Sequence, residues 1–338
     1  MKRMQYLMVC LSIFLFFSAC ADEEQEQVAQ PHQQLIVLFS PGGLGDMGYN
    51  DQVLRGLQTV KKEREDVEML YYSPSSLEEA EKIFSDWLKM SAGNMPSLFV
   101  FAGSDYEDMA ARWLNNDALD RTNKDILLFE SANTQHLPLH SFQISMYGAS
   151  YLAGITAAAT SARSALVVLG NGTDLPIVYA AHGFAEGFSD GGKQTVETVS
   201  LADDWTGFAA AEEAYRNMSD WTQRYSFVYP VAGGSNNGVF RYIREYPEGL
   251  YTAGMDVDQA PLCTQIVGSV VKHIDLLIED YLTEWIDTSV MPESAIYGLE
   301  SGYIDWVLSP NDEEAFDEKV KNSRVTAINK EKNYVENL

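Results

Sequence analysis

The stretch Pro41-Gly-Gly-Leu-Gly-Asp-Met-Gly-Tyr-Asn50 decides the fold, because it separates an apolar run at residues 35–40 from a helical pattern. A glycine-rich loop between strand and helix lies at the carboxyl end of a strand, where open α/β sheets bind small molecules. We therefore place Asp46, Tyr49 and Asn50 at the mouth of a ligand site. The glycines also satisfy the dinucleotide motif G-x-G-x-x-G, but Asp46 directly after the second one would repel a pyrophosphate.

Short apolar runs and amphipathic stretches alternate along the rest of the chain, which is typical of β-α-β units with parallel sheets. We predict strands at residues 35–40, 68–73, 97–103, 125–131, 141–146, 165–171, 195–201, 226–232 and 250–256. We predict helices near residues 50–64, 76–91, 105–116, 148–162, 176–189, 207–218, 236–245 and 263–283. The length of 338 residues exceeds what one core usually holds, so we expect two similar α/β lobes with a cleft between them.

The N-terminus has the pattern of an export signal. Lys2 and Arg3 form a basic start, residues 6–17 form an apolar core too short to span a bilayer, and Ser-Ala-Cys20 forms a small-residue cleavage site. A cysteine after such a pair resembles the bacterial lipobox, in which the cysteine is acylated. We predict that residues 1–20 are a signal peptide and that Cys20 anchors the protein to a membrane by lipid.

Composition limits the partners and the redox chemistry. Residues 21–34 are acidic and lack apolar periodicity, so we predict a disordered tether. Cys10 leaves with the signal and Cys20 takes lipid, so Cys263 remains alone and no intramolecular disulfide is expected. The formal charge of −26 disfavours nucleic acid as a partner and favours a neutral or cationic ligand.

An enzyme is the alternative from another functional class, because lipid-anchored α/β proteins include hydrolases. The nucleophile motif G-x-S-x-G has its nearest counterpart at residues 233–238, where the spacing is wrong. The five histidines show no metal-ligand spacing. We therefore expect no catalytic residues, no metal and no cofactor.

Seven motifs, in order, resemble the basic membrane protein family, a family of substrate-binding lipoproteins typified by a purine nucleoside receptor. The first, Asp46-Met-Gly-Tyr-Asn50, is similar to the family's Asp-x-Ser-Phe-Asn. The others are Tyr151-Leu-Ala-Gly154, Thr173-Asp-Leu-Pro176 with Gly183-Phe-Ala-Glu-Gly-Phe188, Val231-Ala-Gly-Gly-Ser-Asn-Asn-Gly238, Gly254-Met-Asp-Val-Asp-Gln259, Gly268-Ser-Val-Val-Lys272 and Tyr297-Gly-Leu-Glu-Ser-Gly302. Together they cover essentially the whole chain after the signal.

The resemblance implies a type I periplasmic binding fold, with two Rossmann-like lobes of parallel sheet joined by three crossovers that act as a hinge. We expect lobe 1 at residues 35–135 plus 257–290 and lobe 2 at residues 136–256 plus 291–330. The resemblance also implies a monomeric receptor in the bacterial cell envelope, facing the periplasm or the cell exterior, that delivers a purine nucleoside to an ABC permease. The open alternatives are another solute, such as a sugar or a modified nucleoside, and a signalling or accessory role.

The resemblance assigns roles within a nucleoside site. Tyr49 and Tyr229, one from each lobe, would stack on the base. Asp256 would accept hydrogen bonds from ribose hydroxyls, with Lys272 contacting the ribose or holding Asp256 in place. Tyr49 also suits a rim position, Tyr229 a core position in a buried strand, and Lys272 a solvated helix face.

Five further residues complete the predicted ligand site. Asp46 and Asn50 suit the edge of a base, which displays both donors and acceptors. Asp105 and Glu130 stand where the family carries acidic residues, and Gly234 belongs to the glycine run after a predicted strand. Asp105 has an alternative role as a helix N-cap.

Overall fold

The computed structural model describes residues 32–337, apart from residues 92, 116–119 and 133–136. The predicted signal peptide and the predicted lipid anchor at Cys20 lie outside the described residues. Strand β1 (Gln33–Phe39) begins inside the predicted tether of residues 21–34, so the tether prediction is wrong for its last two residues. Gln33 and Gln34 have polar side chains and so were not predicted as part of a strand, although the backbone of β1 pairs with both neighbouring strands.

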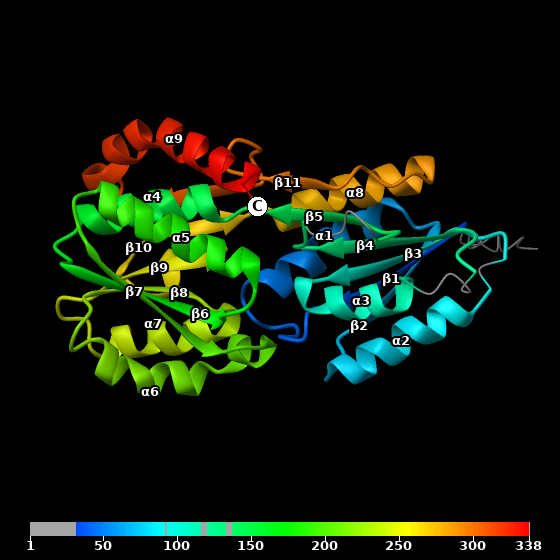
Figure 1. The fold of residues 1–338 in the computed structure, drawn as a ribbon, viewed down its shortest axis with the longest axis horizontal. Coiled ribbons are helices and arrows are strands. Elements are labelled where there is room, and N and C mark those ends of the chain that lie inside the picture. Colours follow the sequence, from blue (N-terminus) through cyan, green and yellow to red (C-terminus); the bar gives the residue numbers. More distant parts are fainter. Residues whose placement is uncertain (1–31, 92, 116–119, 133–136, 338) are drawn as a thin grey trace, which may run out of the picture. The chain divides into compact units, whose positions relative to one another are not determined.

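Two six-stranded sheets form the framework of the molecule (Figure 1). The first has the order β11-β5-β4-β3-β1-β2 and the second the order β12-β10-β9-β8-β6-β7. The remaining strands of the first sheet are β2 (Val67–Tyr72), β3 (Ser97–Ala102), β4 (Lys124–Phe129), β5 (His140–Ile144) and β11 (Ala295–Tyr297). Those of the second are β6 (Ser164–Asn171), β7 (Thr195–Ala202), β8 (Phe227–Val231), β9 (Tyr251–Asp256), β10 (Ile266–Lys272) and β12 (Ile304–Leu308).

Every strand pair in the two sheets is parallel except β10 with β12, which is antiparallel. All nine predicted strands are present. The expectation of an α/β protein with two parallel sheets is therefore confirmed.

Helices cover both faces of each sheet. They are α1 (Tyr49–Glu63), α2 (Leu77–Lys89), α3 (Glu107–Leu114), α4 (Tyr147–Ala159), α5 (Leu175–Asp190), α6 (Ala211–Trp221), α7 (Asn236–Glu245), α8 (Ile274–Thr288) and α9 (Glu313–Glu336). Alternate residues of β1 show the two layers, because successive side chains of a strand point to opposite faces. Leu35 and Val37 pack with residues of α1 and α8, whereas Ile36 and Leu38 pack with residues of α2 and α3.

The prediction of one long helix at residues 263–283 is wrong. Its first half is the strand β10, and only from Ile274 onward is the segment helical. The apolar residues Ile266, Val270 and Ile274 recur at a spacing of four, which favours a helix when the sequence is considered alone. Pairing with β9 on one side and β12 on the other overrides that local preference.

Sheet membership differs from the expected lobe ranges at three strands. β5 lies in the first sheet although its residues fall in the range expected for lobe 2. β10 lies in the second sheet although residues 257–290 were expected in lobe 1, and β11 returns to the first. The chain thus passes between the sheets after β5, after β10 and after β11.

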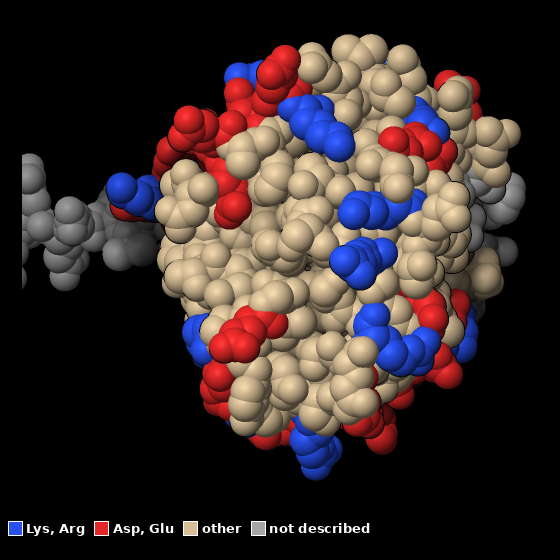
Figure 2. All heavy atoms as spheres, turned by 90° about the vertical axis from the view of Figure 1, so that its left-hand side faces the viewer, with Lys and Arg blue, Asp and Glu red and all other residues tan. Residues whose placement is uncertain are grey.

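The surface carries both signs of charge. Figure 2 shows Lys and Arg side chains interspersed with Asp and Glu on one face. The exposed ion pairs of the structure include Arg224 with Glu197 and Arg241 with Glu212, each at 2.7 Å. Such exposed pairs contribute little stability, roughly 0–1 kcal/mol each. Within the described ranges, no helix combines the length and the apolar character needed to cross a membrane.

Candidate ligand-binding site

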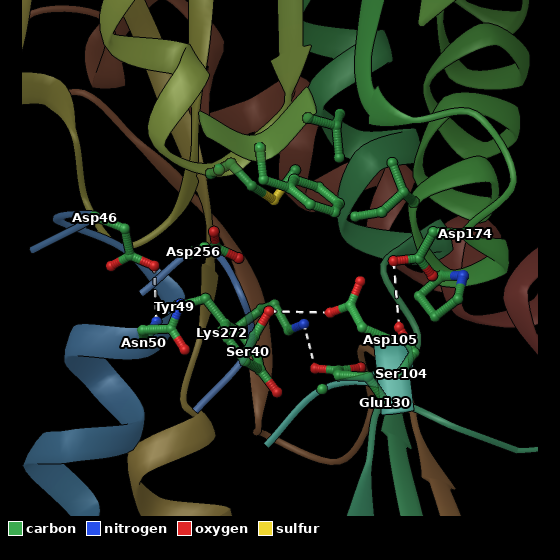
Figure 3. Close-up of a pocket in the computed structure, with 18 of the residues that line it drawn as sticks. Ser40, Asp46, Tyr49, Asn50, Ser104, Asp105, Glu130, Asp174, Asp256 and Lys272 are labelled. Carbon is green, nitrogen blue, oxygen red and sulfur yellow. Dashed lines mark hydrogen bonds and ion pairs between the residues drawn. The ribbon is translucent and has the colours of Figure 1, made fainter. Parts of the chain in front are cut away.

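A cavity lies where the carboxyl ends of strands from both sheets meet (Figure 3). Loops after β1, β3 and β4 contribute residues from the first sheet, and β8, β9 and β10 contribute from the second. Eight of the nine predicted ligand-binding residues line it: Asp46, Tyr49, Asn50, Asp105, Glu130, Gly234, Asp256 and Lys272. Parallel strands bring residues far apart in the sequence to one such edge.

The glycine-rich loop is organised by two aspartates at the start of α1. The Asp46 carboxylate accepts hydrogen bonds from the backbone N–H groups of Gly48 (2.9 Å) and Asn50 (2.9 Å). In turn, Asp51 accepts hydrogen bonds from the backbone N–H groups of Gly45 (2.7 Å) and Met47 (3.0 Å). These bonds satisfy N–H groups that have no partner within the helix, and they fix the path of the loop.

Tyr49 and Asn50 enter the cavity from the first turn of α1. The Tyr49 ring lies under the Lys272 ammonium, with Nζ 5.1 Å from the ring centroid. The Tyr49 hydroxyl and the Asn50 Oδ1 are both buried and have no hydrogen-bond partner. Leaving a buried polar atom unpaired costs about 1–3 kcal/mol, so these two atoms gain most from a polar ligand.

A buried ion pair connects the two sheets beside them. Lys272, at the end of β10, is 3% exposed and donates to the carboxylate of Glu130, which is 6% exposed and follows β4. Lys272 is therefore not a solvated helix lysine, which was the alternative reading of this residue. Its direct partner is Glu130. Its effect on Asp256 is electrostatic: burial raises the pKa of the Asp256 carboxyl, and the Lys272 charge opposes that rise.

Two acids of the cavity have an unusual backbone. Glu130 has a φ of 60° and Asp256 has a φ of 68°. Both values lie in the left-handed region of backbone conformation, which residues other than glycine rarely adopt. The Gln52 side chain holds this part of the chain by donating to the Asp256 carbonyl at 2.6 Å. Strain of this kind persists where the surrounding structure enforces it, and it concentrates at ligand sites.

The opposite side of the cavity holds Ser104, Asp105 and Asp174. Asp105 accepts a hydrogen bond from the Ser40 hydroxyl at 3.0 Å, and it is not the N-cap of either neighbouring helix. Ser104, in the loop after β3, donates to Asp174, in the loop after β6, at 3.3 Å. Like the Lys272–Glu130 pair and the Gln52–Asp256 contact, this hydrogen bond joins residues that lie beside the two different sheets.

Burial and crowding of carboxyl groups shift their pKa values upward. The pKa of Asp174 is raised to about 7, mainly by burial and then by the nearby charges of Asp105 and Glu130. Burial also raises the pKa of Asp256 to about 6, although Lys272 opposes the shift. Perturbed carboxyls in one cavity are typical of functional sites.

The structure does not bring Tyr229 to the cavity lining. Its side chain is fully buried, its hydroxyl lies 2.8 Å from the Ser150 hydroxyl, and its ring stacks on Phe184 with centroids 4.7 Å apart. These contacts are those of a core residue, which was the alternative considered for Tyr229 in the sequence.

Phe208 and Asp174 line the cavity, and the sequence analysis did not include them among the ligand-binding residues. Phe208 lies in a short 3₁₀ helix (Trp205–Ala209), in a segment partly read as a regular helix. A Cβ at Gly170 would collide with its ring, so that glycine makes room for it. The signal for Asp174 was an Asp at the start of a helix followed by Pro176, which marks a strand-to-helix loop.

The chemistry of the lining suits binding of a flat polar molecule. Tyr49 and Phe208 supply aromatic surfaces, and the carboxyl, amide and phenol groups supply acceptors and donors. In the described part of the chain, no group of three or more His, Cys, Asp or Glu residues is arranged to hold a metal ion. The fold and this cavity define a two-sheet α/β protein with a small-molecule site at the strand ends.

Comparison with known proteins narrows this class to a family. Residues 33–336 match the Bmp family, described as ABC transporter substrate-binding protein, PnrA-like, and the chain belongs to this family. Basic membrane protein A of Borreliella burgdorferi is 25% identical over 311 residues, covering 90% of this chain and 87% of that protein. The resemblance to the basic membrane protein family is thus confirmed.

Solved structures confirm the type I periplasmic binding fold. An ABC transporter solute-binding protein from Aeropyrum pernix K1 superimposes with a TM-score of 0.66 at 20% identity, covering 87% of this chain and 80% of that one. The periplasmic component of an ABC-type sugar transport system from Hahella chejuensis gives a TM-score of 0.61 at 16% identity, covering 82% of this chain and all of that one. At these identities the likeness is one of fold.

Proposed function

We propose that this protein is a lipid-anchored receptor outside the cytoplasm that binds a purine nucleoside and delivers it to an ABC-type transporter. Membership of an ABC substrate-binding family supports the transport role. The observation that carries the choice of ligand is the pairing of aromatic surfaces with unpartnered buried polar atoms. A purine nucleoside combines a flat base with ribose hydroxyls, and it matches both features.

The lining suggests how the ligand is held. The base lies against Tyr49 and Phe208, because aromatic stacking contributes about 1–3 kcal/mol for each base. Asn50 hydrogen-bonds to its polar edge, and the Tyr49 hydroxyl, which lies in the plane of the stacked ring, is available to a ribose hydroxyl, since both residues have an atom without a partner. Asp256 accepts hydrogen bonds from ribose hydroxyls. The Asp46 carboxylate organises the loop that positions Tyr49 and Asn50.

Ligand capture then works by hinge closure. Because lining residues come from both sheets, a bound nucleoside contacts both and favours the conformation in which they are close. The three chain passages between the sheets are the places where a hinge would bend. The closed, loaded form would be the one that a permease receives.

Thermal unfolding with a ligand panel tests this function. The purified protein is first unfolded and refolded to remove any co-purified ligand, and is then mixed with adenosine, guanosine, inosine, the free bases or ribose. A ligand at 100 times its dissociation constant stabilises a protein by about 2.7 kcal/mol, which raises the midpoint by several degrees. We expect that rise with a purine nucleoside and not with ribose. A rise with sugars alone would replace the nucleoside by a sugar.

A further inference from the structure

The lining of the cavity is strongly acidic. Five carboxyl groups contribute to it: those of Asp46, Asp105, Glu130, Asp174 and Asp256. Lys272 is the one basic residue among the described lining residues, and its ammonium already binds Glu130. Among the described lining residues, therefore, no unpaired ammonium group is available to bind an anionic group of a ligand.

The acids lie at both ends of the cavity. Figure 3 shows Asp46 and Asp256 at one end and Asp105 and Asp174 at the other, with Lys272 between them. With the ribose hydroxyls at Asp256, as in the proposed function, a 5′ group that points across the cavity faces the end that holds Asp105 and Asp174.

The Asp174 side chain leaves one of its two carboxylate oxygens without a partner in the protein. It is the N-cap residue of α5, yet its side chain makes no capping hydrogen bond. Its Oδ2 accepts the hydrogen bond from Ser104, and its Oδ1 is buried with no partner. An acceptor that neither caps the helix nor meets another protein group is available to a donor on a ligand.

The start of α5 is also unsuited to an anion. Helix N-termini usually attract phosphate groups, because their free N–H groups and the helix dipole favour negative charge. Here the N-cap residue is the acid Asp174, and Pro176, which has no N–H, stands in the first turn. Both residues line the cavity, and both weaken the attraction.

We propose that Asp174, with Asp105 beside it, is a specificity-determining residue that accepts hydrogen bonds from an uncharged nucleoside and excludes its phosphorylated forms. This inference rests on the proposed nucleoside function and deepens it. A hydroxyl or N–H group satisfies the free Oδ1, whereas a phosphate dianion brings like charge and no donor. A nucleotide would then have to lose its phosphate, by a reaction such as phosphomonoester hydrolysis, before this protein could bind it.

The electrostatics of Asp174 agree with this role. Burial raises the pKa of Asp174 to about 7, and the charges of Asp105 and Glu130 contribute in the same direction. The carboxylate is thus already crowded by negative charge. A further anion beside it would be more unfavourable than at an exposed acid, because burial weakens solvent screening.

Calorimetric titration at pH 8 tests the proposal, since Asp174 is then mostly ionised. The probes are adenosine, guanosine and inosine, their 5′-monophosphates and their uncharged 5′-O-acetyl esters, which separate charge from size. The proteins are wild type, Asp174→Asn and the matched control Asp203→Asn, which removes an exposed charge outside the cavity. Asn keeps an oxygen that can accept the Ser104 hydrogen bond.

We expect wild type to bind a monophosphate roughly 100-fold or more weakly than its nucleoside, and the acetyl ester, which lacks the 5′ donor but carries no charge, at least tenfold more tightly than the monophosphate. Asp174→Asn should reduce the discrimination against phosphate at least tenfold, and Asp203→Asn should leave it unchanged. Nucleoside binding with the same discrimination in Asp174→Asn, or equal rejection of the acetyl ester, would overturn the inference alone. A folded protein that binds no nucleoside would overturn the proposed function, and this inference with it.

Discussion

At the scale of single residues, Asp256 combines several properties that a structural role does not require. It is 8% exposed, it has a left-handed backbone, and its pKa is raised to about 6 by burial. A Cβ at Gly48 would lie only 3.4 Å from its Oδ2, so the glycine-rich loop approaches this carboxyl closely. Such a residue suits recognition of ligand hydroxyl groups.

Replacing Asp256 by Asn should weaken nucleoside binding about 5- to 10-fold at pH 8, because Asn keeps an oxygen that can still accept a neutral hydrogen bond. The change removes the charge from a hydrogen bond worth roughly 1.5–3 kcal/mol, while Asn tolerates the left-handed backbone. Isothermal calorimetry measures the effect. Asp258→Asn is the matched control, because Asp258 is exposed and does not line the cavity, and its affinity should equal that of wild type. Equal affinities for all three proteins would remove Asp256 from the site.

At the scale of elements, strand ends were predictable and the segment after β9 was not. β3 and β4 have every or nearly every residue buried. Asp105 was predicted directly after the first of these strands, whereas Glu130 was predicted within the second, which in fact ends one residue earlier, at Phe129. In β10, glycine and serine interrupt the apolar run, and the spacing of its branched residues fits a helix. Pairing with the neighbouring strands β9 and β12 decides the structure of such a segment, and β12 lies more than thirty residues further along the chain.

The helix α9 was also missed, yet it carries a buried acid that holds two passages between the sheets. Glu331 is 4% exposed and accepts hydrogen bonds from the Gly148 N–H (2.9 Å), the Leu299 N–H (2.6 Å) and the Ser145 hydroxyl (2.7 Å). A Cβ at Gly148 or at Gly298 would overlap the Glu331 carboxylate. Glycine at both positions therefore makes room for this acid.

Replacing Glu331 by Ala should lower the free energy of unfolding by about 3 kcal/mol, because it leaves three buried donors unpaired. Denaturant unfolding measures the loss, and hydrogen exchange at the Gly148 and Leu299 amides should increase. Glu336→Ala is the control on the same helix, since Glu336 is exposed, and its effect should stay within about 0.5 kcal/mol. A loss no greater than that of the control would show that the three hydrogen bonds contribute little.

At the scale of the whole molecule, periodicity predicted two parallel sheets but not how they share the chain. Each predicted strand existed, whereas β5 and β10 belong to the sheet opposite the one expected from their place in the sequence. The site shows the same limit. Residues next to strand ends, such as Asp105, were identified, but Phe208 reaches the cavity through a short 3₁₀ helix that no periodic pattern marks.

The raised pKa values of the buried acids predict how the stability of the ligand-free molecule depends on pH. The pKa values of Asp174 and Asp256 are raised to about 7 and about 6, against an ordinary Asp value near 3.9 in the unfolded chain. Between about pH 4 and pH 7 the folded state therefore binds more protons than the unfolded state. The contribution of these groups to stability must then fall as pH rises through that range and level off above it.

Urea unfolding at pH 5 and at pH 8, at one ionic strength, measures this dependence. We expect the stability of Asp174→Asn relative to wild type to be greater at pH 8 than at pH 5 by roughly 1–3 kcal/mol, because folded Asp174 is mostly protonated at pH 5 and mostly ionised at pH 8. Asn cannot ionise, so the variant does not bear the cost of a buried charge. Asp203→Asn makes the same charge change at an exposed site and should follow wild type at both pH values. If Asp174→Asn also followed wild type, the Asp174 carboxyl would ionise at no cost in the folded state, and crowding of negative charge around it would not account for ligand selection.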